Sequence, residues 1–166
     1  MTDEGKGRVV EVARLGAQGD GIVETPDGPA YLPFALPGER WRIVVGQPPE
    51  RLTEGPDRQR PICRHFGTCG GCVAQHMSPE LYRSWKQSAL LQAFAHRGID
   101  MTPEPMRIVA AQSRRRAFFG VARRGDDVVL GFREAGSHSL VDLAECPVLD
   151  SVIVEALPAL RELARV

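Results

Sequence analysis

The stretch Cys63-Arg-His-Phe-Gly-Thr-Cys69-Gly-Gly-Cys72-Val-Ala-Gln-His76 carries the strongest signal in this sequence. Its three cysteines follow a C-x5-C-x2-C pattern, without the periodicity of a helix or a strand. A fourth cysteine, Cys146, lies far downstream and is followed by a proline. Four soft thiolate ligands indicate zinc or an iron–sulfur cluster. Structural zinc sites usually combine two short ligand pairs, whereas three clustered cysteines with a remote Cys-Pro are typical of 4Fe–4S ligation.

We therefore expect a 4Fe–4S cluster with four thiolate ligands, Cys63, Cys69, Cys72 and Cys146. The glycines of the stretch, Gly67, Gly70 and Gly71, would let backbone N–H groups approach the cluster. Two alternatives are less favoured. His65 and His76 would be ligands of a mixed zinc site, or Cys146 would be a nucleophile with His138 as its base.

Composition limits the class of protein. The chain has 166 residues, 21 basic and 21 acidic side chains and 43% hydrophobic residues, which suits one soluble domain or two small ones. No apolar run is long enough to span a membrane, and the polar stretch from Met1 to Arg8 does not resemble a secretory signal. We expect a cytoplasmic protein in a reducing compartment, without a membrane partner.

The expected fold is mainly β with α (α+β). Residues 1–55 predict a small OB-like β-barrel, because short apolar runs alternate with Gly/Pro turns. Its strands are expected at 8–13, 22–23, 30–32 and 41–45. Residues 46–62, rich in proline, predict a linker. Residues 56–166 are expected to form a cluster-binding α+β subdomain.

Within that subdomain, Ser78-Pro-Glu80 predicts a helix start and Gly98 its end, so we expect a helix over 79–97. The stripe of Leu81, Trp85 and Ala89 is expected to pack in the core. Strands are expected at 106–111, 117–123, 128–133 and 139–141, with a turn at 125–127, and a closing helix at 149–164 containing Pro158.

The cysteine stretch, followed by Gly131-Phe-Arg133, His138-Ser-Leu-Val-Asp142 and Glu145-Cys-Pro-Val-Leu149, resembles bacterial RNA (uracil-5-)-methyltransferases. Gly19-Asp-Gly-Ile-Val23 and Leu36-Pro-Gly-Glu39 are similar to the TRAM domain of that family, a small RNA-binding β-barrel. The resemblance covers most of residues 5–150. It implies S-adenosylmethionine as methyl donor of the parent protein and RNA as partner, with ribosomal RNA favoured over transfer RNA and no DNA expected.

In that family a methyltransferase domain carries the donor site, the nucleophilic cysteine and the base. This sequence has no glycine-rich cofactor fingerprint, so we expect no catalytic and no S-adenosylmethionine-binding residue in this chain, which alone would be inactive. It would be the N-terminal RNA- and cluster-binding region of a 23S rRNA (uracil-5-)-methyltransferase. The rival hypothesis is a self-contained zinc-binding RNA adaptor without catalytic activity.

RNA binding needs cations for phosphates and aromatic surfaces for bases. The stretch from Arg107 to Arg124 holds six arginines and no acid. On a strand, Phe118 and Phe119 would point to opposite faces, and one would join the core. Tyr31 and Trp41 are expected in the core rather than against bases. The predicted RNA contacts are Arg114, Arg115, Arg116, Phe118, Arg123, Arg40 and Arg42, with Arg14 a further candidate; the alternative for the arginine run is a solvated strand edge.

Overall fold

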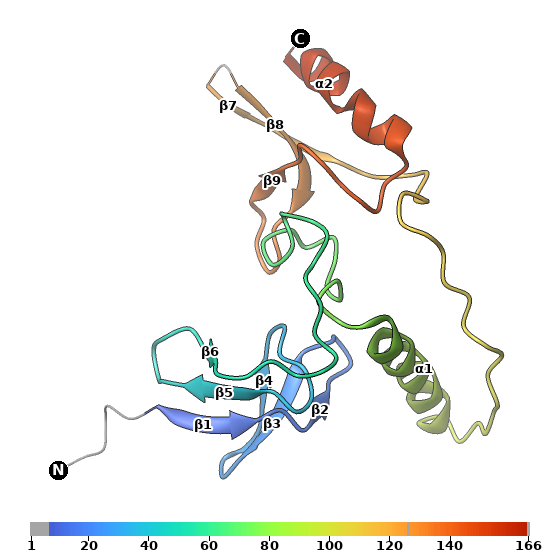
Figure 1. The fold of residues 1–166 in the computed structure, drawn as a ribbon. Helices are drawn as coiled ribbons and strands as arrows, with labels where there is room; N and C mark the ends of the chain where they lie inside the picture. The colour runs from blue at the N-terminus through green and yellow to red at the C-terminus, as the bar shows by residue number, and fades with distance from the viewer. Residues whose placement is uncertain (1–6, 126, 166) are drawn as a thin grey trace. The chain divides into compact units, whose positions relative to one another are not determined.

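The computed structural model describes residues 7–125 and 127–165. They form two compact units (Figure 1): residues 7–60 with 76–106, and residues 61–75 with 107–125 and 127–165. The predicted fold class is confirmed at the level of a mainly β chain with two helices, arranged as three small antiparallel sheets. No helix in the described part of the chain is long and apolar enough to cross a bilayer.

The first unit contains two three-stranded sheets. One has the order β1-β5-β6, and the other has the order β2-β3-β4. The chain passes from the first sheet to the second at Val12 and Ala13, whose N–H groups donate to the carbonyls of Glu39 and Ile22. The bounds are Arg8–Glu11 for β1, Arg14–Leu15 for β2, Gly21–Thr25 for β3, Gly28–Leu32 for β4, Arg40–Ile43 for β5 and Glu50–Arg51 for β6.

The predicted closed barrel is wrong for the described residues. The strands remain two separate sheets, because β2 and β6 have only two residues each and pair with one neighbour. Apolar side chains of both sheets still share one core, which consists of Val10, Val12, Val23, Leu32 and Ala35 with Ala30, Trp41 and Ile43 packed against it. The short strand β6 also replaces part of the predicted linker.

Helix α1, Pro79–Ala95, belongs to the first unit and confirms the predicted start. The Ser78 side chain accepts a hydrogen bond from the Leu81 N–H, and proline occupies the first turn. Gly98 follows the helix with a φ of 67°, as a C-terminal glycine does. The predicted apolar stripe is only partly buried: Trp85 is buried, while Leu81 and Ala89 keep some exposure.

The second unit is a β7-β8-β9 sheet covered by helix α2, which lies alongside β8 (Figure 1). Its core consists of Leu130, Val141, Leu143 and Leu157. Pro158 lies inside the helix, as predicted. The predicted turn at 125–127 includes Asp126, which lies outside the described residues. The bounds are Gly120–Arg124 for β7, Asp127–Arg133 for β8, Leu140–Asp142 for β9 and Ser151–Arg165 for α2.

Two strand predictions in this unit are corrected. Residues 106–111 form no strand: Ile108 and Val109 are 48% and 77% exposed, and no strand pairs with them. The strand expected at 117–123 begins only at Gly120, so Arg114 to Phe119 lack the strict alternation of a strand.

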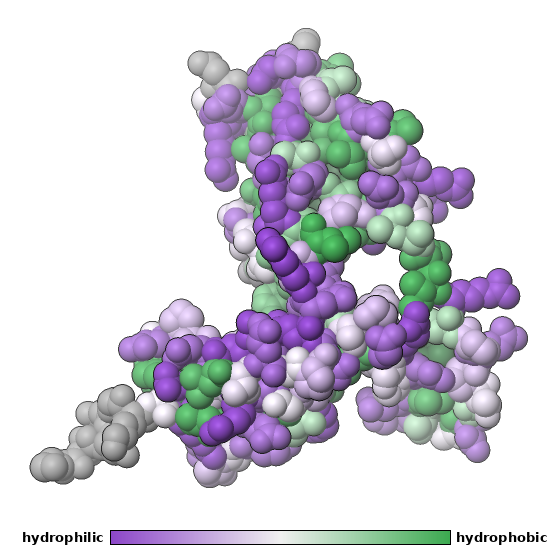
Figure 2. All heavy atoms as spheres, viewed as in Figure 1, coloured by the Kyte–Doolittle hydropathy of each residue, from purple (hydrophilic) through white to green (hydrophobic). Residues whose placement is uncertain are grey.

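On the face shown in Figure 2, hydrophilic side chains cover most of each unit, and apolar ones form separate patches.

Candidate functional site: a four-cysteine cavity beside a basic segment

The cysteine loop is held in place by backbone hydrogen bonds to the end of β8. The Gly70 N–H donates to the Arg133 carbonyl at 2.9 Å, and the Ala135 N–H donates to the Thr68 carbonyl at 2.9 Å. A side chain at Gly70 would press on the backbone of residues 133–135. Gly67 has a φ of 92°, which a glycine adopts without strain. These contacts fix the path of Cys63, Cys69 and Cys72.

Cys146 reaches the same place from the loop after β9. The carboxylate of its neighbour Glu145 accepts a hydrogen bond from the Arg64 N–H at 3.3 Å and lies 3.8 Å from the Arg64 guanidinium. On its other side, the Arg114 N–H donates to the Val148 carbonyl at 3.1 Å. The loop of Cys146 therefore lies between the cysteine loop and the start of the basic segment.

All four cysteines line one small cavity, and all four are free thiols. Apolar side chains form the rest of the wall, above all Phe132 and Leu143. Burial raises the pKa of Cys63, and the neighbouring Cys146 and Cys72 raise it further. Burial likewise raises the pKa of Cys69, against a hydrogen bond from the Gly71 N–H to its sulfur at 3.4 Å. The sulfurs are thus close enough to affect one another's charge.

The donor set of this cavity consists of four cysteine sulfurs, which are soft ligands. Among the residues that the structure describes, no three His, Cys, Asp or Glu side chains are grouped as a site for a single metal ion. The four sulfurs instead surround a shared cavity, and a backbone N–H already points at one of them. Such an arrangement suits a cluster whose corners are each held by one cysteine.

The two histidines of the stretch are not part of this cavity wall. His76 belongs to the first unit, where it is 1% exposed and packs edge-on against Phe34 at 5.7 Å between ring centroids. His65 does not line the cavity, although its carbonyl accepts a hydrogen bond from the Cys69 N–H at 2.8 Å. His138 is exposed beside Arg133, at 3.1 Å, and does not line the cavity either.

The basic segment adjoins the cysteine cavity. Arg114, Arg115, Arg116 and Phe118 line a shallow hollow together with Phe132, and both Arg114 and Phe132 also line the cysteine cavity. The Phe118 side chain is 96% exposed, whereas Phe119 packs on the core at 5.3 Å from Phe132. One phenylalanine is thus in the core, as the sequence predicted, and the other is free to stack.

The remaining predicted RNA contacts have different surroundings. Arg123 donates from its guanidinium to the carbonyls of Ala164 and Arg165, at 3.2 and 2.9 Å, and so caps the end of α2. Arg42 pairs with Glu50 at 2.6 Å on the surface. Arg40 and Arg14 are exposed.

Trp41 and Tyr31, two aromatic side chains of the first unit, differ in burial. Trp41 packs on the core and donates to the Glu39 carboxylate at 3.1 Å, as expected of a core residue. Tyr31 is 60% exposed, so its predicted place in the core is wrong. Sequence reasoning also missed Phe132, which joins the two cavities; the only signal was its place in the Gly131-Phe-Arg133 motif.

Comparison with known proteins gives the class of protein. The chain is homologous over nearly its whole length to RNA methyltransferases, which confirms the resemblance seen in the sequence. It is 40% identical over 168 residues to an uncharacterized RNA methyltransferase of Brucella suis, an alignment that covers 98% of this chain and 40% of that protein. A Caulobacter vibrioides RNA methyltransferase is 41% identical over 157 residues, covering 90% of this chain and 38% of that protein.

Relatives with a particular activity are also found. The 23S rRNA (uracil(1939)-C(5))-methyltransferase RlmD of Halomonas elongata is 37% identical over 172 residues, with 96% of this chain and 35% of that protein covered. The chain spans about 40% of the length of the curated relatives it matches. No family model matches the sequence.

Proposed function

We propose that this chain is the RNA-binding and 4Fe–4S-binding region of a 23S rRNA (uracil-5-)-methyltransferase. The observation that carries the proposal is the convergence of three clustered cysteines and one distant cysteine on one cavity. The homology supports the enzyme class, because relatives of that name include the RlmD proteins of Halomonas elongata and Chromohalobacter salexigens. S-adenosylmethionine would bind in a part of the enzyme outside these residues.

The residues that would hold the cluster are Cys63, Cys69, Cys72 and Cys146. A bound cluster would supply four iron–thiolate bonds, and those bonds would tie the loop of residues 63–72 to the loop after β9. The free energy of cluster binding would then add to the folding stability of the second unit. Transfer of a methyl group to uracil C5 needs no electron from the protein, so we assign these cysteines a structural role.

The basic segment beside this cavity would hold the RNA. Arg115 and Arg116 have the charge that phosphates need, and the exposed ring of Phe118 offers a surface for stacking a base. An enzyme that modifies a base must reach it outside the helical stack. The proposed part of this chain in the reaction is to bind the RNA and direct its path, and the chain alone would transfer no methyl group.

Replacement of one ligand tests the cluster assignment. We expect the substitution Cys146→Ser to lose most of the iron and to expose residues 58–78 to proteolysis, because one attachment of the loop is gone. The matched control is Glu145→Gln, which keeps all four sulfurs and an acceptor for the Arg64 N–H. Iron content, visible absorbance and limited proteolysis are measured anaerobically. Full absorbance and full protease resistance in Cys146→Ser would remove Cys146 from the ligand set.

A further inference from the structure

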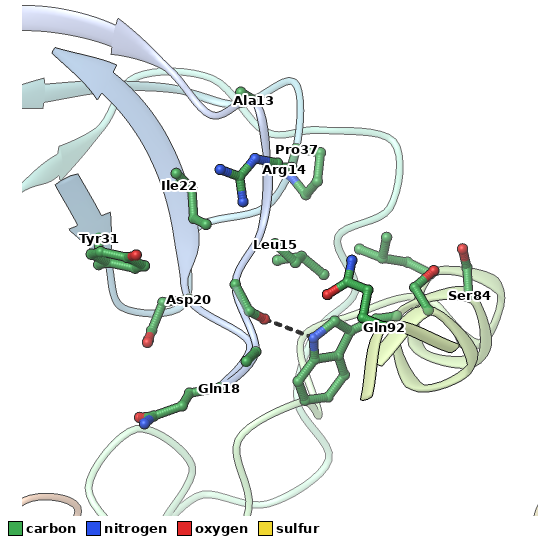
Figure 3. Close-up of a pocket in the computed structure, with 15 residues that line it drawn as sticks. Ala13, Arg14, Leu15, Gln18, Asp20, Ile22, Tyr31, Pro37, Ser84 and Gln92 are labelled. Carbon is green, nitrogen blue, oxygen red and sulfur yellow. Dashed lines mark hydrogen bonds between the residues drawn. The ribbon is translucent and has the colours of Figure 1, made fainter. Parts of the chain in front are cut away.

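A second cavity lies within the first unit, which contains none of the four cysteines. It is a cleft of about 770 Å³ between the β2-β3-β4 sheet and helix α1, a size that suits a small ligand. Its polar and aromatic wall contains Arg14, Asp20 and Tyr31 from the sheet side and Ser84, Trp85 and Gln92 from α1. Figure 3 shows Leu15 of the sheet side and Gln92 of α1 facing one another, with Arg14 and Tyr31 farther from the helix.

The sheet wall places a cation and an aromatic ring in one row. Arg14 on β2 pairs with Ile22 on β3, and Ile22 pairs with Tyr31 on β4. Residues directly opposite one another on antiparallel strands have side chains on the same face, so all three share a face. Ile22 is 3% exposed beneath its neighbours, while Tyr31 is 60% exposed. Among the described residues, no carboxylate forms an ion pair with Arg14.

The helix wall is attached to the turn of residues 16–19. The Trp85 indole N–H donates to the Gly16 carbonyl at 2.9 Å, as the dashed line in Figure 3 shows. Gly19 has a φ of 89°, and a side chain there would lie 3.2 Å from the Trp85 ring. The turn of residues 16–19 thus fits closely against α1, and this turn forms one side of the cleft.

The chemistry of this wall matches one unstacked nucleotide. An exposed tyrosine ring can stack on a base, and an unpaired guanidinium can donate two parallel hydrogen bonds to a phosphate. The Gln92 amide can donate and accept at a base edge, and the Asp20 carboxylate accepts from a base N–H. Asp20 also disfavours a second phosphate group, which argues for one nucleotide within a strand rather than a free polyphosphate.

We infer that this cleft binds a single unstacked nucleotide of the RNA, with its base on Tyr31 and its phosphate on Arg14. The inference rests on the proposed function in one respect, namely that the chain binds RNA. It adds a second RNA site, on a different unit from the basic segment of residues 114–118, and predicts which side chains recognise the base and which recognise the phosphate.

The test is equilibrium binding of a fluorescent, unstructured single-stranded RNA by the full chain. We expect Tyr31→Ala to weaken binding at least fivefold, because base–aromatic stacking is lost, with an unchanged salt dependence. Tyr31→Phe should bind like the unaltered chain. Arg14→Gln should reduce the slope of log K against log salt concentration by about 0.7, the value for one phosphate contact on a single strand.

The matched control is Arg8→Gln, which removes an exposed arginine of the same unit from β1, outside the cleft. Equal binding by Tyr31→Ala and the unaltered chain would overturn the inference. An equal loss of salt slope in Arg8→Gln and Arg14→Gln would also overturn it, because the attraction would then be general. If the unaltered chain bound no RNA at all, the proposed function would fail, which is a distinct result from failure of the cleft alone.

Discussion

Glu39 is fully buried and accepts several hydrogen bonds within the described part of the first unit. It accepts from the Leu36 N–H at 3.0 Å, from the Trp41 indole at 3.1 Å and from the Arg58 guanidinium, through Nε and through Nη2 at 2.9 Å. Burial raises the pKa of Glu39, but the hydrogen bonds and the charge of Arg58 outweigh it and hold that pKa below its ordinary value. In this unit Leu36-Pro-Gly-Glu39 is therefore a structural motif that attaches residue 58 to the sheets.

We predict that Glu39→Gln destabilises the chain by about 3 kcal/mol, because removal of one partner leaves the buried Arg58 guanidinium without its countercharge. Urea unfolding measures the change. Glu50→Gln, which breaks the exposed pair with Arg42, is the control and should cost less than about 1 kcal/mol. A similar small cost for both variants would contradict the structural role of Glu39.

His76 gives the first unit a dependence on pH. Its burial and the nearby positive charge of Arg58 lower its pKa to about 4, with Glu39 opposing and Arg51 adding to the effect. The unfolded chain binds this proton near pH 6.5, whereas the native chain does not, so stability falls as pH falls from about 6.5 to about 4.

The expected loss over that interval is on the order of 3 kcal/mol. Urea unfolding at a series of pH values should show it for the unaltered chain and for His96→Gln, which changes an exposed histidine. It should be largely absent from His76→Gln. An unchanged pH profile in His76→Gln would mean that another group titrates.

Among the elements, helix α1 and the arginine segment illustrate what the sequence can and cannot predict. Local signals predict the start of α1, because a serine cap and an early proline act within one turn. They did not predict where Arg114 to Phe119 would lie. Arg114, at the start of that segment, is held instead by hydrogen bonds with Val148 and Asp150, which are distant in sequence. The same reason explains the missing strand at 106–111, where an apolar run has no partner strand to pair with.

We predict that the arginine segment contributes to RNA binding through both charge and stacking. The double change Arg115→Gln/Arg116→Gln should lower the slope of log K against log salt concentration by about 1.4. Phe118→Ala should weaken binding at least fivefold without altering that slope. Fluorescence titration with single-stranded RNA measures both effects. The control is Arg97→Gln, which changes an arginine just beyond the end of α1. If this variant lowered the salt slope by half as much as the double variant or more, a specific role of Arg115 and Arg116 in RNA binding would be contradicted.

For the whole molecule, the cysteine spacing predicted which four thiols would meet, and the structure brings all four to one cavity. The cleft between β2-β3-β4 and α1 was not predictable from motifs, since its wall combines strand partners with residues some 60 positions further along the chain. Closure of a barrel was also mispredicted, because strand count and turn signals do not show how long each pairing will be. The sequence thus predicts which residues have metal-binding chemistry, whereas surfaces built from distant segments can be described only once the fold is known.

We propose that Cys63, Cys69, Cys72 and Cys146 hold a 4Fe–4S cluster. The most direct measurement is the iron, sulfide and zinc content of the anaerobically purified chain, recorded with its visible spectrum. We expect about four irons and four sulfides per chain, with broad absorbance near 400 nm that is absent from Cys146→Ser. One tightly held zinc and no iron after anaerobic reconstitution would contradict the cluster assignment and would favour a zinc-binding RNA adaptor instead.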